Sequence, residues 1–435
     1  MTYHNAIKYI KNAKKSRPSD PSFSHMRTLC AHLDDPQKRI SYLRLAGSNG
    51  KTLCGGMLTS VLKHTDLCVG YLAMPVREDI RENILIDGLP ITMEELVCYT
   101  ETVARAVTAI QAKEAAEGEG DGEAQADEAN EKEGFFLTSS EILLAIALLA
   151  FRDRQCKLCL IESDHDANDP SRFLPSPFAA VICGTIPHGE KPEIARIRSY
   201  VTRGTQELVS APQNADAHRI LADTCASVNC RLTLPQKSAL EVTRLSLRET
   251  EFIYKEHPYT VNLCGRFQVA NALVAIETLE MLTRRGYDIP EEAIIRGLSS
   301  LSIPTKFEIL SAMPFIIADS THTPIAIETV SDSMTEFRSH TGDRIRLCLP
   351  SAELAEQYWT ALQARGYVVE RMILVCEDET AVCDGIACPV TLCKTVKQAT
   401  KECLHDLGQD GFLLISGTHG FSAKMRYEIL ATLGF

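Results

Sequence analysis

A six-residue loop between an expected strand and an expected helix carries the residue types that bind phosphate. The loop consists of Gly47, Ser48, Asn49, Gly50, Lys51 and Thr52. The apolar run 40–46 before it is typical of a strand, and residues 51–63 after it have the apolar spacing of a helix. Glycines let main-chain N–H groups close on an anion, and a helix N-terminus favours negative charge. This order predicts a site for the phosphates of a nucleoside triphosphate.

Two side chains of the loop suit a complex of nucleotide and metal. A lysine at the position of Lys51 bridges the terminal phosphates, and the hydroxyl of Thr52 can ligate magnesium. A longer form of the motif would have a further glycine at Leu45, so this is the shorter variant. The alternative is an accidental Gly-Lys-Thr at a helix start, but the expected strand and helix on either side favour phosphate binding.

Length and composition set the class of protein that must position this loop. A chain of 435 residues is too long for one core, so two domains are expected. Hydrophobic content of 45% and charged content of 23% are typical of a globular protein in water. There is no apolar run of membrane-spanning length, and residues 1–8 lack the apolar core of a signal peptide. These features predict a cytoplasmic protein without a membrane partner.

The net charge of -12 is concentrated in one segment. Nine acids and two lysines fall within residues 113–134, which leaves about -5 for the rest of the chain. Without large apolar residues this stretch cannot bury enough surface to fold, so 112–134 is predicted to be a disordered acidic insert. A solvated continuation of the helix before it is the alternative. Because there is no basic stripe, nucleic acid is not an expected partner.

The sixteen cysteines do not indicate a metal site or a disulfide framework. Most lie inside apolar runs, where cysteine behaves as a small buried hydrophobe. Cys156 and Cys159 form the one tight pair and have no second pair or histidine partner nearby, which argues against zinc. Reduced thiols agree with the expected cytoplasmic location.

Strands and helices alternate along the first half of the chain. Apolar runs with amphipathic helices between them predict a mainly parallel sheet covered on both faces. Period-two alternation over 240–264 predicts an antiparallel meander, and helices are expected at 268–285 and 290–298. The expected strands are 40–46, 67–74, 156–163, 179–184 and 207–211, and the expected helices are 51–63, 92–112, 138–151 and 192–203.

A serine- and proline-containing stretch, 299–304, is the best candidate for a domain boundary. It divides the chain into a nucleotide-binding domain, 1–298, and a smaller C-terminal α/β domain, 304–435. Strands are expected in the second domain at 307–310, 315–319, 344–349, 371–375 and 412–416.

Several segments, in order, resemble one known family. The chain is similar to the folylpolyglutamate synthases of the Mur ligase superfamily over most of residues 40–330. The segments that carry the resemblance are Ala46 to Thr52, Glu82 to Gly88 with Pro90-Ile91-Thr92, Leu137-Thr138-Ser139-Ser140-Glu141, Gly265 to Ala272, Pro304 to Glu308, and Asp319 to Pro324.

The resemblance implies a fold and an activity. The fold would be α/β, with a P-loop central domain of the Mur ligase type, built on a mainly parallel sheet, and a smaller C-terminal α/β domain. The activity would be that of an ATP-dependent acid–amino-acid ligase of one-carbon metabolism, with ATP and Mg²⁺ as cofactors. ATP would phosphorylate a folate-like or other carboxylate, and the amine of glutamate or another amino acid would attack the acyl phosphate. A monomer is expected.

The resemblance also implies residue roles, which carry over by position. Lys51 would hold the terminal phosphates. Magnesium would be bound by Thr52, Glu141 and His188. The nucleotide would be contacted by the loop residues and by Asn271, Lys306, Asp319 and His322, with His322 contributed by the second domain so that domain closure completes the site.

Local roles are the alternative for four of these side chains. Glu141 could be a partner of its helix N-terminus, and His188 could be a turn histidine. Asn271 could bond within its own helix, and Asp319 could cap the helix that follows it.

The sequence departs from the family pattern at positions that the family uses for metal and phosphate. The pattern Ser-Pro-His is replaced by Met74-Pro75-Val76, which removes a hydroxyl ligand and an imidazole. A glycine-rich stretch is replaced by the polar run 162–167. Arg198 stands at the position of the carbamylated lysine, where it would be a fixed cation. The linker arginine is replaced by Lys306, and an asparagine by Thr323.

Two interpretations of these departures stay open. The chain could be a divergent ligase with one magnesium, in which Arg198 neutralises phosphate or pairs with Asp164 or Asp166. It could instead be a degenerate member that binds nucleotide as a scaffold or regulator. A third class, a P-loop kinase or switch, would need an acid after a strand near the loop. Glu162 could serve, but no switch or nucleobase motif accompanies it.

Overall fold

The fold is described from a computed structural model of the chain. It describes residues 1–14, 22–47, 50–74, 76–77, 79–118, 134–163, 169–174, 177–184, 198–199, 201–246, 248–376 and 385–434. Cysteines in these ranges are free thiols. Over the same ranges, no helix combines the length and the apolar character needed to cross a bilayer.

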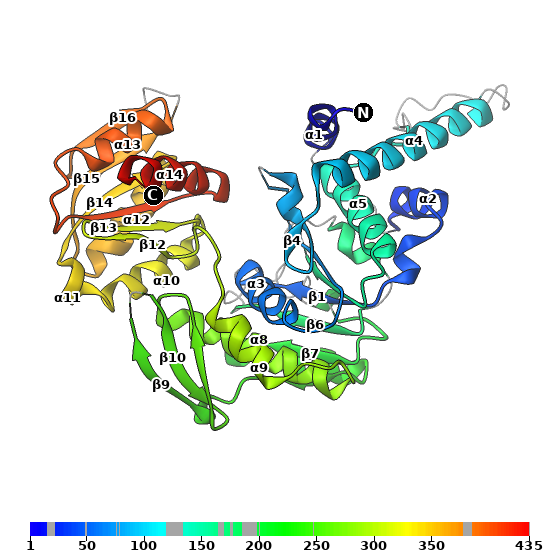
Figure 1. Cartoon of the computed structure of the whole chain (residues 1–435), viewed down its shortest axis with the longest axis horizontal. Helices are drawn as coiled ribbons and strands as arrows, with labels where there is room; N and C mark the ends of the chain where they lie inside the picture. The colour runs from blue at the N-terminus through cyan, green and yellow to red at the C-terminus, as the bar shows by residue number, and fades with distance from the viewer. Residues whose placement is uncertain are drawn as a thin grey trace. The chain divides into compact units, whose positions relative to one another are not determined.

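The chain divides into two compact units (Figure 1). The first unit comprises residues 1–235 and 274–297, and the second comprises 236–273 and 298–435. The division falls within helix α8 (Arg266–Arg284). Compactness therefore groups 236–273 with the C-terminal residues, whereas the sequence places the boundary at 299–304. That boundary, as a limit between functional domains, stays a prediction.

The first unit is built on a sheet of eight strands in the order β4-β3-β2-β5-β1-β6-β7-β8. The strands from β2 to β8 in this order are parallel, and β3 and β4 are antiparallel additions at one edge. The strands are β1 (Tyr42–Ala46), β2 (Val69–Leu72), β3 (Ile84–Ile86), β4 (Leu89–Pro90), β5 (Leu158–Glu162), β6 (Ala179–Ile182), β7 (Glu207–Ser210) and β8 (Arg231–Thr233).

Helices of the first unit pack on this sheet in a long apolar core. Helix α5 is buried along nearly its whole length and packs beside α4, as Figure 1 shows. Burying this much apolar surface is the main force that holds the helices on the sheet. The helices are α1 (Tyr3–Lys11), α2 (Ser24–His32), α3 (Lys51–Leu62), α4 (Met93–Gly118), α5 (Ser139–Asp153), α7 (Ala215–Ser227) and α9 (Glu291–Ser299).

The second unit contains two sheets. An antiparallel meander joins β9 (Leu240–Leu245), β10 (Thr250–Tyr254) and β11 (His257–Val261), as the period-two pattern predicts. A mainly parallel sheet has the order β12-β13-β17-β14-β15-β16. Its strands and helices are β12 (Glu308–Ala312), β13 (Phe315–Asp319), α10 (Pro324–Thr335), α11 (Arg338–Thr341), β14 (Arg344–Leu349), α12 (Ala352–Ala364), β15 (Val368–Val375), β16 (Val390–Cys393), α13 (Val396–Leu404), β17 (Phe412–Ser416) and α14 (His419–Leu433).

Alternating residues of the six-stranded sheet enter two different cores. Ile317 and Leu414 pack on one face of the sheet, and Ile316 and Leu413 pack on the other. Such alternation covers both faces of a parallel sheet with helices. The α/β class expected from the sequence is confirmed.

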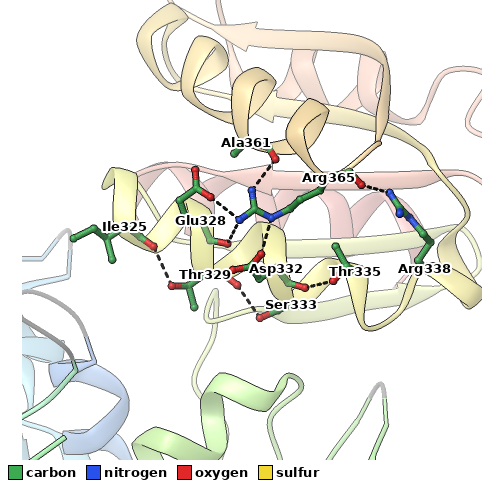
Figure 2. A network of polar contacts seen from close by, with 9 residues as sticks. All are labelled: Ile325, Glu328, Thr329, Asp332, Ser333, Thr335, Arg338, Ala361 and Arg365. Atoms are coloured by element: carbon green, nitrogen blue, oxygen red, sulfur yellow. Dashed lines mark hydrogen bonds and ion pairs between the residues drawn. The ribbon is translucent and has the colours of Figure 1, made fainter. Parts of the chain in front are cut away.

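Arg365, directly after α12, ties α10 to α12 (Figure 2). Its guanidinium donates to Glu328 at 2.5 Å, to Asp332 at 2.7 Å and to the carbonyl of Ala361 at 2.8 Å. The hydrogen bonds that Arg365 donates to Asp332, and then to Glu328, raise the pKa of Arg365, so it stays charged.

One sequence expectation needs correction. Helix α4 runs through Gly118, so residues 112–118 are helical and not part of a disordered insert. These residues continue the helix, as the alternative interpretation states. The end of the helix is held because Gln111 donates to the carbonyl of Phe135 at 2.8 Å, and the amide of Phe135 donates to Glu114 at 3.1 Å. Residues 119–133 lie outside the described part of the chain, as does most of the helix expected at 192–203.

Candidate nucleotide site

The phosphate loop lies between a central strand and a helix, where the sequence places it. Strand β1 is buried throughout and has β5 and β6 as its neighbours. Helix α3 begins at Lys51, directly after the loop. Because ligands of open parallel sheets bind at the carboxyl ends of the strands, this position suits a binding site. Ser48 and Asn49 lie outside the described residues.

Two glycines give the loop a backbone that other residues strain to adopt. Gly47 has φ +116° and Gly50 has φ +80°. A Cβ at Gly47 would lie 2.4 Å from the carbonyl oxygen of Cys183, which follows β6. The close packing of this loop against the end of β6 therefore requires glycine at 47.

Lys51 is buried, with 6% of its surface exposed, at the first turn of α3. Its Nζ donates to the carbonyl oxygen of Ser163 at 2.5 Å. Ser163 is just beyond β5, and its amide donates to the carbonyl of Leu45 at 2.8 Å. The ammonium thus lies between the phosphate loop and the end of β5, and Thr52 beside it is half-buried.

A buried carboxylate, Glu162, also reaches this edge of the sheet. It is the last residue of β5, is 0% exposed, and pairs in register with Leu45. One carboxylate oxygen accepts from the main-chain N–H of Met74 at 3.0 Å, and the other accepts from the hydroxyl of Tyr71. Burial, then the charge of Glu162, raises the pKa of Tyr71 well above its usual value, so the phenol keeps its proton.

Glu141 makes the local contact that was the alternative to its implied role in metal binding. It completes a capping box at the start of α5, where its carboxylate accepts from the main chain of Thr138 at 2.8 Å and from the hydroxyl of Thr138 at 3.1 Å. The local alternative therefore fits Glu141, and a magnesium role for it stays a prediction that this geometry does not support. Among the described residues, Glu162 is a buried carboxylate that pairs with Leu45, two residues before the phosphate loop.

The other first-unit residues add little to the site. His188 lies outside the described residues, as do Asp164 and Asp166. Arg198 lies in a short described stretch, 198–199, and is exposed. Their roles stay predictions.

The candidate residues of the second unit gather at the carboxyl end of β13. Asp319 is 3% exposed, and its Oδ2 accepts from the amide of Phe307 at 2.8 Å. Burial raises the pKa of Asp319, and the nearby ammonium of Lys306 opposes that rise. His322 is exposed, and its Nδ1 lies 3.3 Å from the carbonyl oxygen of Ser320.

Three buried polar atoms near this strand end have no hydrogen-bond partner among the described residues. They are Asp319 Oδ1, Ser320 Oγ and Thr323 Oγ1. Buried polar atoms normally have hydrogen-bond partners. A group of buried polar atoms without partners is therefore a feature of sites where a polar ligand supplies the missing hydrogen bonds.

Asn271 behaves as its local alternative predicts. It is half-buried on α8, and its amide nitrogen lies 3.5 Å from Gln268 Oε1, three residues earlier. The structure thus shows a contact within one helix, and contact of Asn271 with nucleotide stays a prediction.

Comparisons with known proteins agree with this geometry. No model of a protein family matches the chain. A probable bifunctional folylpolyglutamate synthase/dihydropteroate synthase of Halobacterium salinarum is 27% identical over 354 residues, which cover 78% of this chain but 40% of that protein. The folylpolyglutamate synthase of Lacticaseibacillus casei is 23% identical over 354 residues, 78% of each chain.

Solved structures show the same fold over the whole length. The apo form of the L. casei enzyme has a TM-score of 0.77 at 21% identity, with 100% of both chains covered. A complex of a folylpolyglutamate synthase with AMPPCP and folate has a TM-score of 0.79 at 20% identity, again with 100% of both chains covered. The Thermotoga maritima structure has a TM-score of 0.77 at 18% identity and covers 99% of this chain and 97% of its own.

The fold and the loop define the class: this is an α/β protein whose fold is similar to that of solved folylpolyglutamate synthases, with a glycine–lysine loop after its central strand β1. Within that class, the chain is similar in sequence to folylpolyglutamate synthases, at 23–27% identity over 78% of its length. It spans about 40% of the length of the two haloarchaeal relatives, which are named as bifunctional, and 78% of the L. casei enzyme.

Proposed function

We propose that this chain is an ATP-dependent ligase that joins an amino acid to a carboxylate acceptor through an acyl phosphate. The observation that carries the proposal is the phosphate loop with Lys51 and Glu162 beside it. A cation for the phosphates and a carboxylate for a metal lie at one edge of the same sheet, where a phosphoryl group can be held and transferred.

Magnesium nucleotide fits the residues that are present. Lys51 supplies a buried positive charge, and Glu162 supplies oxygen ligands. Ser163 Oγ is buried and has no hydrogen-bond partner among the described residues, so a polar group is accommodated there. The proposed ligands of Mg²⁺ are Thr52 and Glu162, and the bound ion would neutralise phosphate charge.

The end of β13 in the second unit is proposed, by itself, to bind a polar ligand, and the resemblance implies that this ligand is a nucleotide. Asp319 keeps one buried oxygen without a partner among the described residues, and Lys306 carries positive charge near it. Their position at the end of β13 is that of a ligand site in an open α/β sheet. Arg198 is exposed and remains available to neutralise a phosphate.

Folate and glutamate are the proposed first substrates to test. Relatives of this chain are named for folylpolyglutamate synthesis, and a structure of similar fold contains folate and AMPPCP. Met74 and Val76 replace two polar residues of the family pattern, so acceptors other than folates belong in the test.

The test is ADP release from ATP and Mg²⁺ with a panel of folates and other carboxylates, each with and without glutamate. Amino-acid-dependent ADP release that is lost in Lys51→Ala supports the ligase. Nucleotide binding without ADP release from any acceptor would contradict it and favour a scaffold or regulatory role.

A further inference from the structure

A buried tyrosine ends against the carboxylate of the candidate site. Tyr71 lies on β2, is 2% exposed, and pairs in register with Leu160 of β5. Its hydroxyl donates to one oxygen of Glu162, whose other oxygen accepts from the amide of Met74. Both donors therefore belong to β2 and the residues just after it.

Helix α3 leaves a space for this ring at Gly55. A Cβ at position 55 would lie 2.7 Å from the Tyr71 hydroxyl oxygen and 2.8 and 2.9 Å from two ring carbons. Glycine inside a helix destabilises it relative to alanine, so its presence in the first turns of α3 needs a reason. The close approach of the tyrosine supplies that reason, and it makes Gly55, Tyr71 and Glu162 one packed unit.

The two hydrogen bonds fix the direction of the carboxylate. Each carboxylate oxygen can accept about two hydrogen bonds or ligands. Tyr71 and the Met74 amide each use one of these positions, which leaves the remaining lone pairs of Glu162 for a cation. Groups that hold a ligating carboxylate in place typically change metal affinity about 10–100-fold when they are removed.

We propose that Tyr71 is a positioning residue that sets the strength of divalent-cation binding at Glu162. This inference rests on the proposed function, because it requires magnesium nucleotide at the phosphate loop. The second donor is the main chain of Met74, so this hydrogen bond does not depend on the side chain at that position.

The test compares Tyr71→Phe with the unchanged chain. Phenylalanine keeps the ring against Gly55 and removes the hydroxyl alone. The free Mn²⁺ signal in electron paramagnetic resonance measures the affinity of Mn²⁺ for the protein with AMPPCP bound, and calorimetry in EDTA measures AMPPCP without metal. We expect Mn²⁺ to bind about 10–100-fold more weakly, and metal-free AMPPCP affinity to stay within about twofold.

A matched control is Tyr254→Phe. Tyr254 is equally buried, and its hydroxyl accepts from the amide of Gln236 at 2.9 Å in the antiparallel meander. We expect no change in Mn²⁺ affinity. Gly55→Ala is the second variant, because its Cβ displaces the Tyr71 ring without removing the hydroxyl, and it should weaken Mn²⁺ binding in the same direction.

The outcomes separate this inference from the proposed function. If the unchanged chain does not bind AMPPCP, the proposed function fails and this inference fails with it. If the chain binds Mn²⁺ and AMPPCP, and Tyr71→Phe and Gly55→Ala leave Mn²⁺ affinity unchanged, only the inference is overturned. Equal losses of metal-bound and metal-free AMPPCP affinity in both variants would also overturn it, since they indicate general damage to the loop.

Discussion

Lys51 and Glu162 bring opposite charges to the buried edge of the first-unit sheet. Each makes hydrogen bonds to the protein that fix its position: Lys51 donates to Ser163, and Glu162 accepts from the Met74 amide. A charge held in a fixed position in a low-dielectric site needs little reorganisation when phosphate arrives. At the scale of single residues, the proposed phosphate site therefore has its charged side chains held in place in advance.

Replacing Lys51 by alanine should reduce AMPPCP affinity about 100-fold or more. The lost side chain supplies charge-assisted hydrogen bonds of about 1.5–3 kcal/mol each, and roughly 3 kcal/mol corresponds to a factor of about 100. Calorimetry measures the affinity, and thermal melting checks that the fold persists. Lys38→Ala is the control, because Lys38 is exposed and bonds to Asp35. Equal affinities in both variants would refute the site.

Replacing Glu141 by alanine should affect stability and not metal binding. Its carboxylate caps α5, and loss of a capping interaction costs about 0.5–2 kcal/mol. Urea unfolding should show this loss, while Mn²⁺ affinity with AMPPCP stays as in the unchanged chain. A fall in Mn²⁺ affinity with no loss of stability would restore Glu141 as a metal ligand and contradict the choice of Glu162.

At the scale of elements, function depends on how tightly the loop packs against its neighbours. The turn at Gly47 touches the end of β6, and Gly55 lets α3 approach β2. Strand β6 pairs directly with β1, and β2 is joined to β1 through β5. The loop is therefore held by the central strands of the sheet as well as by its own helix.

Gly47→Ala should destabilise the chain and weaken nucleotide binding. Two effects lower the free energy of unfolding: the strain of the positive φ, and the clash of the new Cβ with the carbonyl of Cys183. Gly286→Ala separates them, because Gly286 has φ +92° and nothing within 4 Å of an added Cβ. In urea unfolding, we expect Gly286→Ala to lower the free energy of unfolding by roughly 1 kcal/mol, and Gly47→Ala to lower it by clearly more. Equal costs would mean that the contact with Cys183 does not restrict the loop.

Arg365→Ala should loosen α10 from α12 (Figure 2). The variant removes bonds to Glu328 and Asp332, but both carboxylates are partly exposed, so solvent screening limits the expected loss to about 1–2 kcal/mol. Arg296→Ala, which removes an exposed pair with Glu292, should change stability by less than about 0.5 kcal/mol. A urea midpoint that does not move for Arg365→Ala would contradict this role.

At the scale of the whole molecule, the acidic segment 112–134 joins the end of α4 to the start of α5. The described helix α4 ends at Gly118, and the chain returns before α5 through Phe135. Gln111 and Glu114 hold that return, so the part of the segment before 119 contributes to the first unit.

Replacing 119–133 by a short Gly-Ser linker should change the melting temperature by less than roughly 2 °C, because no described contact is removed. Deleting 113–134 should lower it by several degrees, because the bond from Glu114 to Phe135 is lost with the last turn of α4. Scanning calorimetry of both deletions decides between these outcomes. A large loss for the first deletion would show that 119–133 packs on the unit.

The alternation of strands and helices and the phosphate loop could be predicted because they depend on neighbouring residues. Period-two alternation identified the meander, and the spacing of glycines and lysine identified the turn before α3. The elements that were missed include the 13-residue helix α7 (Ala215–Ser227) and the four-residue strand β16 (Val390–Cys393). Their apolar signals are brief, and packing in the finished sheet stabilises them more than local preference does.

The sequence by itself determined the phosphate loop, the α/β class and the similarity to the folylpolyglutamate synthases. Only the tertiary structure decided which carboxylate meets that loop. Glu141 and Glu162 both follow patterns that suit a ligand site, but a capping box occupies the first locally. The pairing of β1 with β5 places the second next to Leu45 and the loop, and Tyr71 of β2 reaches it across the same sheet. Such contacts depend on strand order, which residues distant in the sequence establish only when the sheet forms.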